Sequence, residues 1–237
     1  MRRSCHQLCP LYSSKIFEIH LDFFVRKLYN IYEQKIKGVC TMNIHDKVNY
    51  LLSLNNGFLT TQQTREFGIS SKVLSQLVIE NIVEKVAYGL YLGAEYWPDP
   101  FYIAQYRYPK LIFSHLTALF LHGLSNRDPL IYMATIPTGG NSRLLKSTDF
   151  RFYYNNEKLI AMGVEKIKSP WGNEIKVFDV ERTLCDCIKY INHLDRDLIL
   201  TGFKFYLKSE QKNSIKLMEY AKQLKISDKI YQYLEVL

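Results

Sequence analysis

The chain has 237 residues, 47% of them hydrophobic, and its 31 Lys and Arg against 23 Asp and Glu give a formal net charge of +8. This length and composition predict one or two folded domains and exclude an intrinsically disordered chain. The positive charge favours an acidic partner such as nucleic acid, but it is unevenly spread. Residues 42–97 carry 4 basic and 5 acidic side chains, whereas residues 98–237 carry 20 and 15.

Residues 1–41 form an N-terminal extension to the patterns that follow. The apolar run that starts at Ile16 is broken by charged side chains, so it is neither a signal sequence nor a membrane span. Codons for Lys37 and Gly38 can form a purine-rich ribosome-binding sequence just ahead of Met42. We therefore expect Met42 to be the start of the protein and residues 1–41 to be translated leader.

The five cysteines do not form a disulfide framework. Their odd number, with Cys185 and Cys187 far from the other three, predicts reduced thiols and a cytoplasmic protein. The string Cys5-His6-x-x-Cys9 lacks a second ligand pair at zinc-site spacing, and no glycine-rich phosphate loop occurs. We predict no metal site, no cofactor and no membrane partner.

Residues 42–97 predict a winged helix-turn-helix domain with three helices and a hairpin. A first helix, with apolar residues at helical spacing, runs from Met42 to Leu54. Two segments rich in β-forming residues, 82–86 and 90–92, flank a tight turn at residues 87–89. This hairpin is the predicted wing.

The helix-turn-helix itself lies between these segments. Thr60 or Thr61 can cap a short second helix, which Gly68 stops, and Ser70 can cap a third helix that runs to about Asn81. Two helices separated by a few residues with a Gly in the turn are typical of a helix-turn-helix.

We predict that the third helix enters the major groove of double-stranded DNA, because its first turns contact base edges in such modules. Gln reads adenine, and Lys favours guanine or phosphate. The predicted contacts to an inverted-repeat operator are Gln62, Arg65, Ser70, Ser71, Lys72, Ser75, Gln76, Lys85 and Tyr88. Since this segment is almost neutral, basic residues elsewhere must supply most of the attraction to phosphate. A protein–protein module is the alternative for a winged helix.

A Pro-rich junction at residues 97–100 predicts a boundary, after which residues 98–237 form an α+β domain with a small sheet and a helical C-terminus. The expected helices are 101–108, 114–121, 180–191, 195–207, 214–224 and 227–234. The expected strands are 130–136, 150–154, 163–167 and 174–178.

One pattern in this domain leaves an alternative function open. Glu174 and Lys176 lie on the same face of a predicted strand, with Asp149 upstream. This set is similar to the two carboxylates and lysine with which restriction-type nucleases hold magnesium. The alternative is therefore a DNA-binding defence protein with a nuclease-like second domain.

Two further strings carry a resemblance to a known family. They read FSHLTALFLHGL at residues 113–124 and FDVERTLCD at residues 178–186, and they follow a predicted wing that ends in Gly89-Leu90-Tyr91. In this order the chain from Met42 onward resembles the AbiEi family, the antitoxins of abortive-infection (type IV) toxin–antitoxin systems in phage defence. The resemblance implies a non-enzymatic, two-domain protein. Its N-terminal domain represses its own operon, and its C-terminal domain neutralises a nucleotidyltransferase-like toxin without a stable complex.

The resemblance also makes the helix that follows Asp179 a candidate antitoxin surface. We predict that this surface comprises Arg182, Asp186, Lys189, Lys204 and Lys208. Arg182 and Asp186 are four residues apart and also fit an ordinary ion pair on one helix. No residue is predicted to be catalytic.

Overall fold

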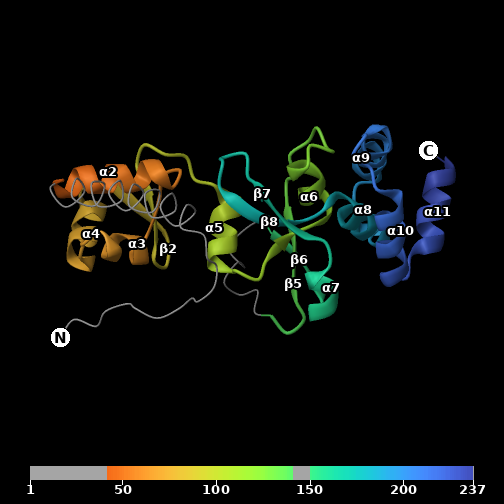
Figure 1. The fold of residues 1–237 in the computed structure, drawn as a ribbon, viewed down its shortest axis with the longest axis horizontal. Helices are drawn as coiled ribbons and strands as arrows, with labels where there is room; N and C mark the ends of the chain where they lie inside the picture. Colours follow the sequence, from red (N-terminus) through yellow and green to blue (C-terminus); the bar gives the residue numbers. More distant parts are fainter. Residues whose placement is uncertain (1–41, 141–149, 237) are drawn as a thin grey trace, which may run out of the picture. The chain divides into compact units, whose positions relative to one another are not determined.

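The computed structural model describes residues 42–140 and 150–236 (Figure 1). The predicted leader and Asp149 lie outside the described residues. The described chain is a mixed α+β protein with a three-stranded and a five-stranded sheet. Within the described residues, a division into two units falls between residues 50 and 51, inside helix α2 (Ile44–Leu54).

The second unit opens with a three-stranded antiparallel sheet and two short helices. The strand order is β1-β3-β2, so β3 pairs with both neighbours. The elements are β1 (Phe58–Thr60), α3 (Thr61–Glu66), α4 (Ser71–Ile79), β2 (Val83–Ala87) and β3 (Leu90–Gly93). The two predicted helices and the predicted hairpin are confirmed. Strand β1 was not predicted, because three residues leave no readable alternation.

The residues that begin these helices are those that the sequence predicts. Thr60 accepts a hydrogen bond from the amide of Gln63, and the Gln63 side chain accepts one from the amide of Thr60. This reciprocal pair is a capping box. Ser70 caps α4 by accepting from the amide of Val73 at 3.3 Å. Gly68, between the helices, has a φ of +74°, a left-handed conformation that favours glycine and ends α3.

A five-stranded mixed sheet follows, with the order β6-β5-β4-β8-β7. The pairs β4–β8 and β5–β6 are parallel, whereas β4–β5 and β7–β8 are antiparallel. The strands are β4 (Ile112–Phe113), β5 (Tyr132–Pro137), β6 (Phe150–Asn155), β7 (Val164–Lys168) and β8 (Glu174–Phe178). Four of these strands are predicted by the sequence, and the two-residue strand β4 is not.

Helices surround this sheet and continue beyond it. They are α5 (Pro100–Arg107), α6 (His115–Leu121), α7 (Glu157–Ala161), α8 (Val180–Lys189), a 3-10 turn η2 (Ile191–His193), α9 (Arg196–Lys208), α10 (Ser214–Gln223) and α11 (Ser227–Val236). Six of the seven α-helices match predicted ones within a few residues. The short helix α7 was not predicted.

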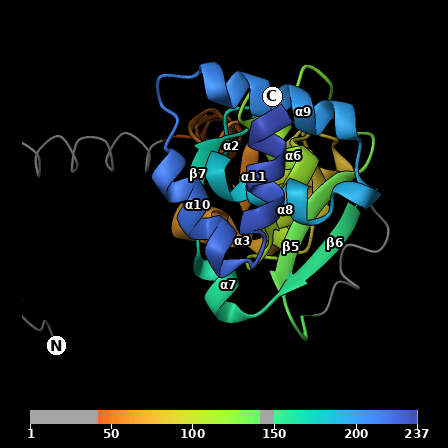
Figure 2. The ribbon, with the colours of Figure 1, turned by 90° about the vertical axis from the view of Figure 1, so that its right-hand side faces the viewer.

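Helix α8 lies at the centre of the helical part and contacts α6, α9, α10 and α11 (Figures 1 and 2). Every residue from Glu181 to Ile188 is buried. Apolar side chains from all five helices form one core around α8. The helix therefore has no solvent-exposed face along most of its length.

Helix α5 contacts both sheets. Tyr106 donates to the carbonyl of Gly89 at 3.1 Å, and Arg107 donates to the carbonyl of Val86 at 2.6 Å. On the other side, Gln105 exchanges two hydrogen bonds with the backbone of Lys176 in β8, at 2.6 and 2.8 Å. The first hairpin is thereby joined to the five-stranded sheet through one helix.

The Pro-rich junction before α5 is anchored within the fold. Asp99 is fully buried and caps α5 by accepting from the amides of Phe101 and Tyr102. Its other carboxylate oxygen accepts from Ser169 and Asn173 in the turn between β7 and β8. The boundary predicted here stays a prediction, and these contacts cross it.

Candidate nucleic-acid interface

The exposed side of α4 is a continuous polar stripe. Two buried leucines, Leu74 and Leu77, hold the helix against the protein, with Val73 and Val78 partly buried beside them. The remaining positions recur at helical spacing and are all exposed: Ser71, Lys72, Ser75, Gln76, Ile79 and Glu80. Four of these six were predicted to contact DNA, so the fold places the predicted recognition residues on one accessible face.

Several of these side chains already make local hydrogen bonds. Ser75 donates to the carbonyl of Ser71 at 3.0 Å, which leaves its oxygen lone pairs open. The amide nitrogen of Gln76 donates to Glu80 at 3.0 Å. Lys72 has an exposed ammonium, which only donates hydrogen bonds.

The predicted contacts on α3 are exposed as well. Gln62 and Arg65 both point away from the core, while Thr64 between them is buried. The amide nitrogen of Gln62 donates to Glu66 at 3.0 Å, in the same i,i+4 arrangement as on α4.

The hairpin presents its turn to solvent. Tyr88 is 94% exposed, and the Lys85 ammonium lies 5.7 Å from the centre of its ring. The carbonyl of Gly89 accepts from the Thr61 amide and from Tyr106, so the turn is held from two helices. A fully exposed tyrosine on an anchored hairpin is available to a partner surface.

Two of the five residues predicted for the antitoxin surface, Arg182 and Asp186 on α8, are buried, so for them the prediction of an accessible surface is wrong. Arg182 is 0% and Asp186 is 1% exposed, because α8 is enclosed by other helices. They form a buried ion pair with Nε 3.0 Å from Oδ2. Arg182 also donates to the carbonyls of Leu159 and Met162, at 2.6 and 3.1 Å, and lies over the Phe178 ring.

The role of this ion pair is structural. Arg182 joins α8 to the backbone at α7 through its bonds to the carbonyls of Leu159 and Met162. Burial raises the pKa of Asp186, and the neighbouring Arg182 opposes that rise. The other predicted members of the surface are accessible, since Lys204 and Lys208 on α9 are exposed and Lys189 is partly exposed.

A polar cavity of about 320 Å³ at the start of α8 was not predicted. Two nearly buried carboxylates, Asp179 and Glu181, line it, and the Lys216 ammonium lies 3.0 Å and 3.4 Å from them. Burial lowers the pKa of Lys216, but the hydrogen bond to Asp179 and the charges of Asp179, Tyr220 and Glu181 together raise it above its ordinary value. Tyr220 donates to Asp179, and burial together with that carboxylate raises its pKa to about 12. Each carboxylate has several partners, so the cluster fastens α8 to α10.

His115, the first residue of α6, is a buried histidine with an uncommon backbone conformation. It is 1% exposed and has a φ of +53°, which is uncommon for a residue with a side chain. Its Nδ1 lies 2.8 Å from the Ser114 hydroxyl, which accepts from Thr135. The described residues provide no hydrogen-bond partner for the other ring nitrogen, Nε2.

The surroundings of His115 keep its imidazole neutral. The ring stacks on Tyr153 at 3.6 Å and meets the edge of Tyr190 at 5.2 Å. Burial lowers the pKa of His115 to about 3, and the charges of Arg182, Lys189 and Arg151 add to that effect.

The pattern that suggested a nuclease is only partly described. Glu174 pairs with Lys166 at 2.7 Å, and Lys176 donates to the carbonyl of Pro109 at 3.1 Å. Asp149 lies outside the described residues. Among residues 42–140 and 150–236, no three His, Cys, Asp or Glu side chains gather in a way that could hold a metal ion.

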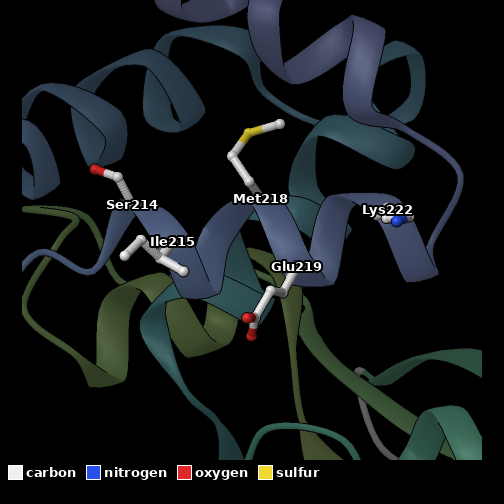
Figure 3. Close-up of a pocket in the computed structure, with 5 residues that line it drawn as sticks. All are labelled: Ser214, Ile215, Met218, Glu219 and Lys222. Atoms are coloured by element: carbon white, nitrogen blue, oxygen red, sulfur yellow. The ribbon is translucent and has the colours of Figure 1, made fainter.

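A shallow groove runs along α10. Figure 3 shows the residues that line it along this helix: Ser214, Ile215, Met218, Glu219 and Lys222. Ile215 is 76% exposed. The groove is apolar, and none of the residues that line it is a predicted DNA contact.

No helix within the described ranges is long and apolar enough to cross a membrane.

The comparisons with known proteins find no match to a family model and none to a curated protein. Among solved structures, the chain is similar to the RV2827C protein from Mycobacterium tuberculosis. The two chains are 10% identical, the match covers 73% of this chain and 71% of that one, and the TM-score is 0.41.

Proposed function

We propose that this chain is a DNA-binding transcriptional repressor of its own operon that also acts as the antitoxin of an abortive-infection toxin–antitoxin system. The observation that carries the DNA-binding part is the exposed polar stripe of α4, from Ser71 to Glu80, beside a hairpin whose tip residue Tyr88 is 94% exposed. Such a helix fits the major groove, and such a hairpin fits the adjacent backbone or minor groove.

The order of the elements supports a winged helix-turn-helix. Along the chain, α2 is followed by β1, α3, α4, β2 and β3, and the hairpin strand β3 pairs with β1. In this arrangement α4 is the recognition helix and the β2–β3 turn is the wing. The N-terminus of α4, where Ser70 occupies the Val73 amide, also carries the positive end of the helix dipole, which attracts phosphate oxygens.

The expected operator is an inverted repeat. One α4 stripe provides a single strong cation, Lys72. One copy of the winged helix-turn-helix segment, called the reading segment below, therefore neutralises few phosphates. Two copies on two half-sites raise the affinity through effective concentration. Basic side chains after residue 98 add non-specific attraction.

The antitoxin part rests on the resemblance of the sequence strings and on the accessible lysines of α9. With Arg182 and Asp186 buried, the proposed antitoxin surface reduces to Lys189, Lys204 and Lys208. We propose that it acts against a nucleotidyltransferase-like toxin without a stable complex.

Reciprocal variants of the full chain test both parts. Ser71→Ala/Lys72→Ala/Gln76→Ala should abolish the gel shift of a duplex from the chain's own promoter, because it removes the central polar groups of the stripe. Lys204→Ala/Lys208→Ala is the matched control, since it removes exposed charge from a helix outside residues 42–97. It should retain the shift, weakened only by the loss of two of the 20 basic side chains in residues 98–237.

In cells that co-express the toxin, the expected pattern reverses. The α4 variant should rescue growth as the unaltered chain does, and the α9 variant should not. If the α4 variant still binds the promoter, the assignment of α4 as the recognition helix is rejected. Full rescue by the α9 variant would reject the proposed antitoxin surface.

A further inference from the structure

The second half of the α4 stripe differs in chemistry from the first. Lys72, in the first turn, offers donors alone, whereas Gln76, Ile79 and Glu80 offer an amide, an apolar surface and a carboxylate. Ile79 is 72% exposed. This half of the stripe therefore has the composition of a site for one particular base pair.

The Gln76 amide is oriented by Glu80. A carboxylate only accepts hydrogen bonds, so the 3.0 Å contact with Glu80 Oε1 must involve the nitrogen of the Gln76 amide. One amide hydrogen is occupied, and the carbonyl oxygen and one hydrogen remain for a partner. They form an adjacent acceptor and donor when Glu80 takes the hydrogen trans to the carbonyl oxygen. In the major groove, adenine offers the complementary pair, its N6 amino group and its N7 acceptor.

Ile79 lies one helical turn beyond Gln76 on the same stripe. An exposed isoleucine in a polar stripe has no core to pack against. The C5 methyl group of thymine is the apolar feature of the major groove, and aliphatic side chains contact it. The amide that suits adenine and the aliphatic group that suits thymine are three residues apart on the exposed face of one helix, where i,i+3 side chains are neighbours.

We infer that Gln76 and Ile79 together read an A·T base pair and that Glu80 is the positioning residue that fixes the Gln76 amide for adenine. This inference rests on the proposed function, because it requires α4 to lie in the major groove. It goes further than that function by naming the base pair and a residue that acts through another.

The charge of Glu80 makes the inference testable. A carboxylate near phosphates lowers the affinity for DNA of any sequence, and its removal raises that affinity. Removal also allows the Gln76 side-chain amide to rotate, so that its oxygen and nitrogen exchange places, which lowers the preference for adenine. The two effects of Glu80→Ala on affinity and on base preference therefore have opposite signs.

The chain supplies a matched control on α3. Gln62 and Glu66 form the same i,i+4 pair with the same 3.0 Å separation, and both are exposed. If such pairs only stabilise their helices, Glu66→Ala and Glu80→Ala change base preference equally little. Glu80→Gln is the conservative variant, since it keeps an acceptor for the Gln76 amide and removes the charge.

The experiment enriches random duplexes on the full chain and then measures competition between duplexes that differ at one base pair. We expect an enriched motif with an adenine whose preference falls by about tenfold in Glu80→Ala, while Glu66→Ala and Glu80→Gln retain it. Replacing the paired thymine by uracil should weaken binding by the unaltered chain and leave Ile79→Ala unaffected.

The outcomes separate the inference from the function beneath it. If the unaltered chain enriches no motif, the proposed function fails and the inference falls with it. A motif that Glu80→Ala retains in full, or that Glu66→Ala loses to the same extent, overturns the inference and leaves the DNA-binding proposal standing. A thymine-to-uracil effect that persists in Ile79→Ala also contradicts it.

Discussion

At the scale of single residues, the same i,i+4 pattern has different consequences on different helices. Arg182 and Asp186 look in the sequence like an exposed helix pair, as do Gln76 and Glu80. The structure buries the first pair and exposes the second. The i,i+4 spacing predicts that two side chains meet. It does not predict their burial, because burial depends on the helices that pack around α8, and these come from distant parts of the sequence.

Because Arg182 is buried, its replacement should be costly. Arg182→Met leaves the Asp186 carboxylate and the carbonyls of Leu159 and Met162 without their donor. We expect the free energy of unfolding to fall by about 3–5 kcal/mol, measured by urea denaturation. In Arg182→Met/Asp186→Leu no lone carboxylate remains, so the loss should be smaller. A loss below about 1 kcal/mol in the single variant would show that the pair is not a buried ion pair.

His115 predicts how stability depends on pH. Its folded pKa, about 3, lies below the ordinary value of 6.5, so below pH 6.5 the unfolded chain binds a proton that the folded chain does not. The contribution of this histidine is therefore complete above pH 6.5 and is lost as the pH falls towards 3. At pH 5 we expect a loss of about 2 kcal/mol in the free energy of unfolding relative to pH 7.

The matched variant for this measurement is His115→Asn. Asn does not titrate in this range and tolerates a positive φ better than most residues, so it keeps the backbone conformation. The difference in unfolding free energy between the two proteins should shrink as the pH falls from 7 to 5. If the two curves run parallel, His115 is not the group responsible.

At the scale of elements, predictions succeed where the chain itself determines the element. Thr60 and Ser70 cap α3 and α4 as predicted, because a capping side chain bonds to amides only a few residues away. The elements that sequence reasoning missed are short: β1, β4 and α7. Strand β4 has two residues and exists because β5 and β8 pair with it on both sides. Pairing of this kind links distant segments, and single-sequence periodicity does not detect it.

Helix α5 leads to a prediction about fragments. The three-stranded sheet buries Phe58, Leu90 and Leu92 against residues of α5 that include Tyr102 and Tyr106. A fragment of residues 42–97 lacks these partners, whereas residues 42–108 retain them. We expect the longer fragment to unfold at a higher temperature by at least several degrees, measured by circular dichroism. Equal melting temperatures would show that α5 contributes little to the stability of the three-stranded sheet.

At the scale of the whole molecule, the groups proposed to contact bases and most of the positive charge lie in different parts of the chain. The stripe of α4 and the Tyr88 turn offer groups that suit bases and grooves, but residues 42–108 hold only 5 basic side chains against 6 acidic ones. Residues 109–237 hold 19 against 14. If the reading segment supplies register and base choice, the excess positive charge behind it supplies the attraction to phosphate.

This division predicts the salt dependence of operator binding. Each phosphate that a Lys or Arg neutralises adds about 0.9 to the slope of log K against log salt concentration. We expect a steeper slope for residues 42–237 than for residues 42–108, by about one unit for each additional phosphate that the second part contacts, measured by fluorescence anisotropy across a salt series. Using residues 42–237 removes the charges of residues 1–41 from the comparison. Lys72→Ala should lower both slopes by about one, because it removes a contact within the reading segment that both chains share. Equal slopes for the two chains would mean that the reading segment alone carries the electrostatic attraction, despite its net negative charge.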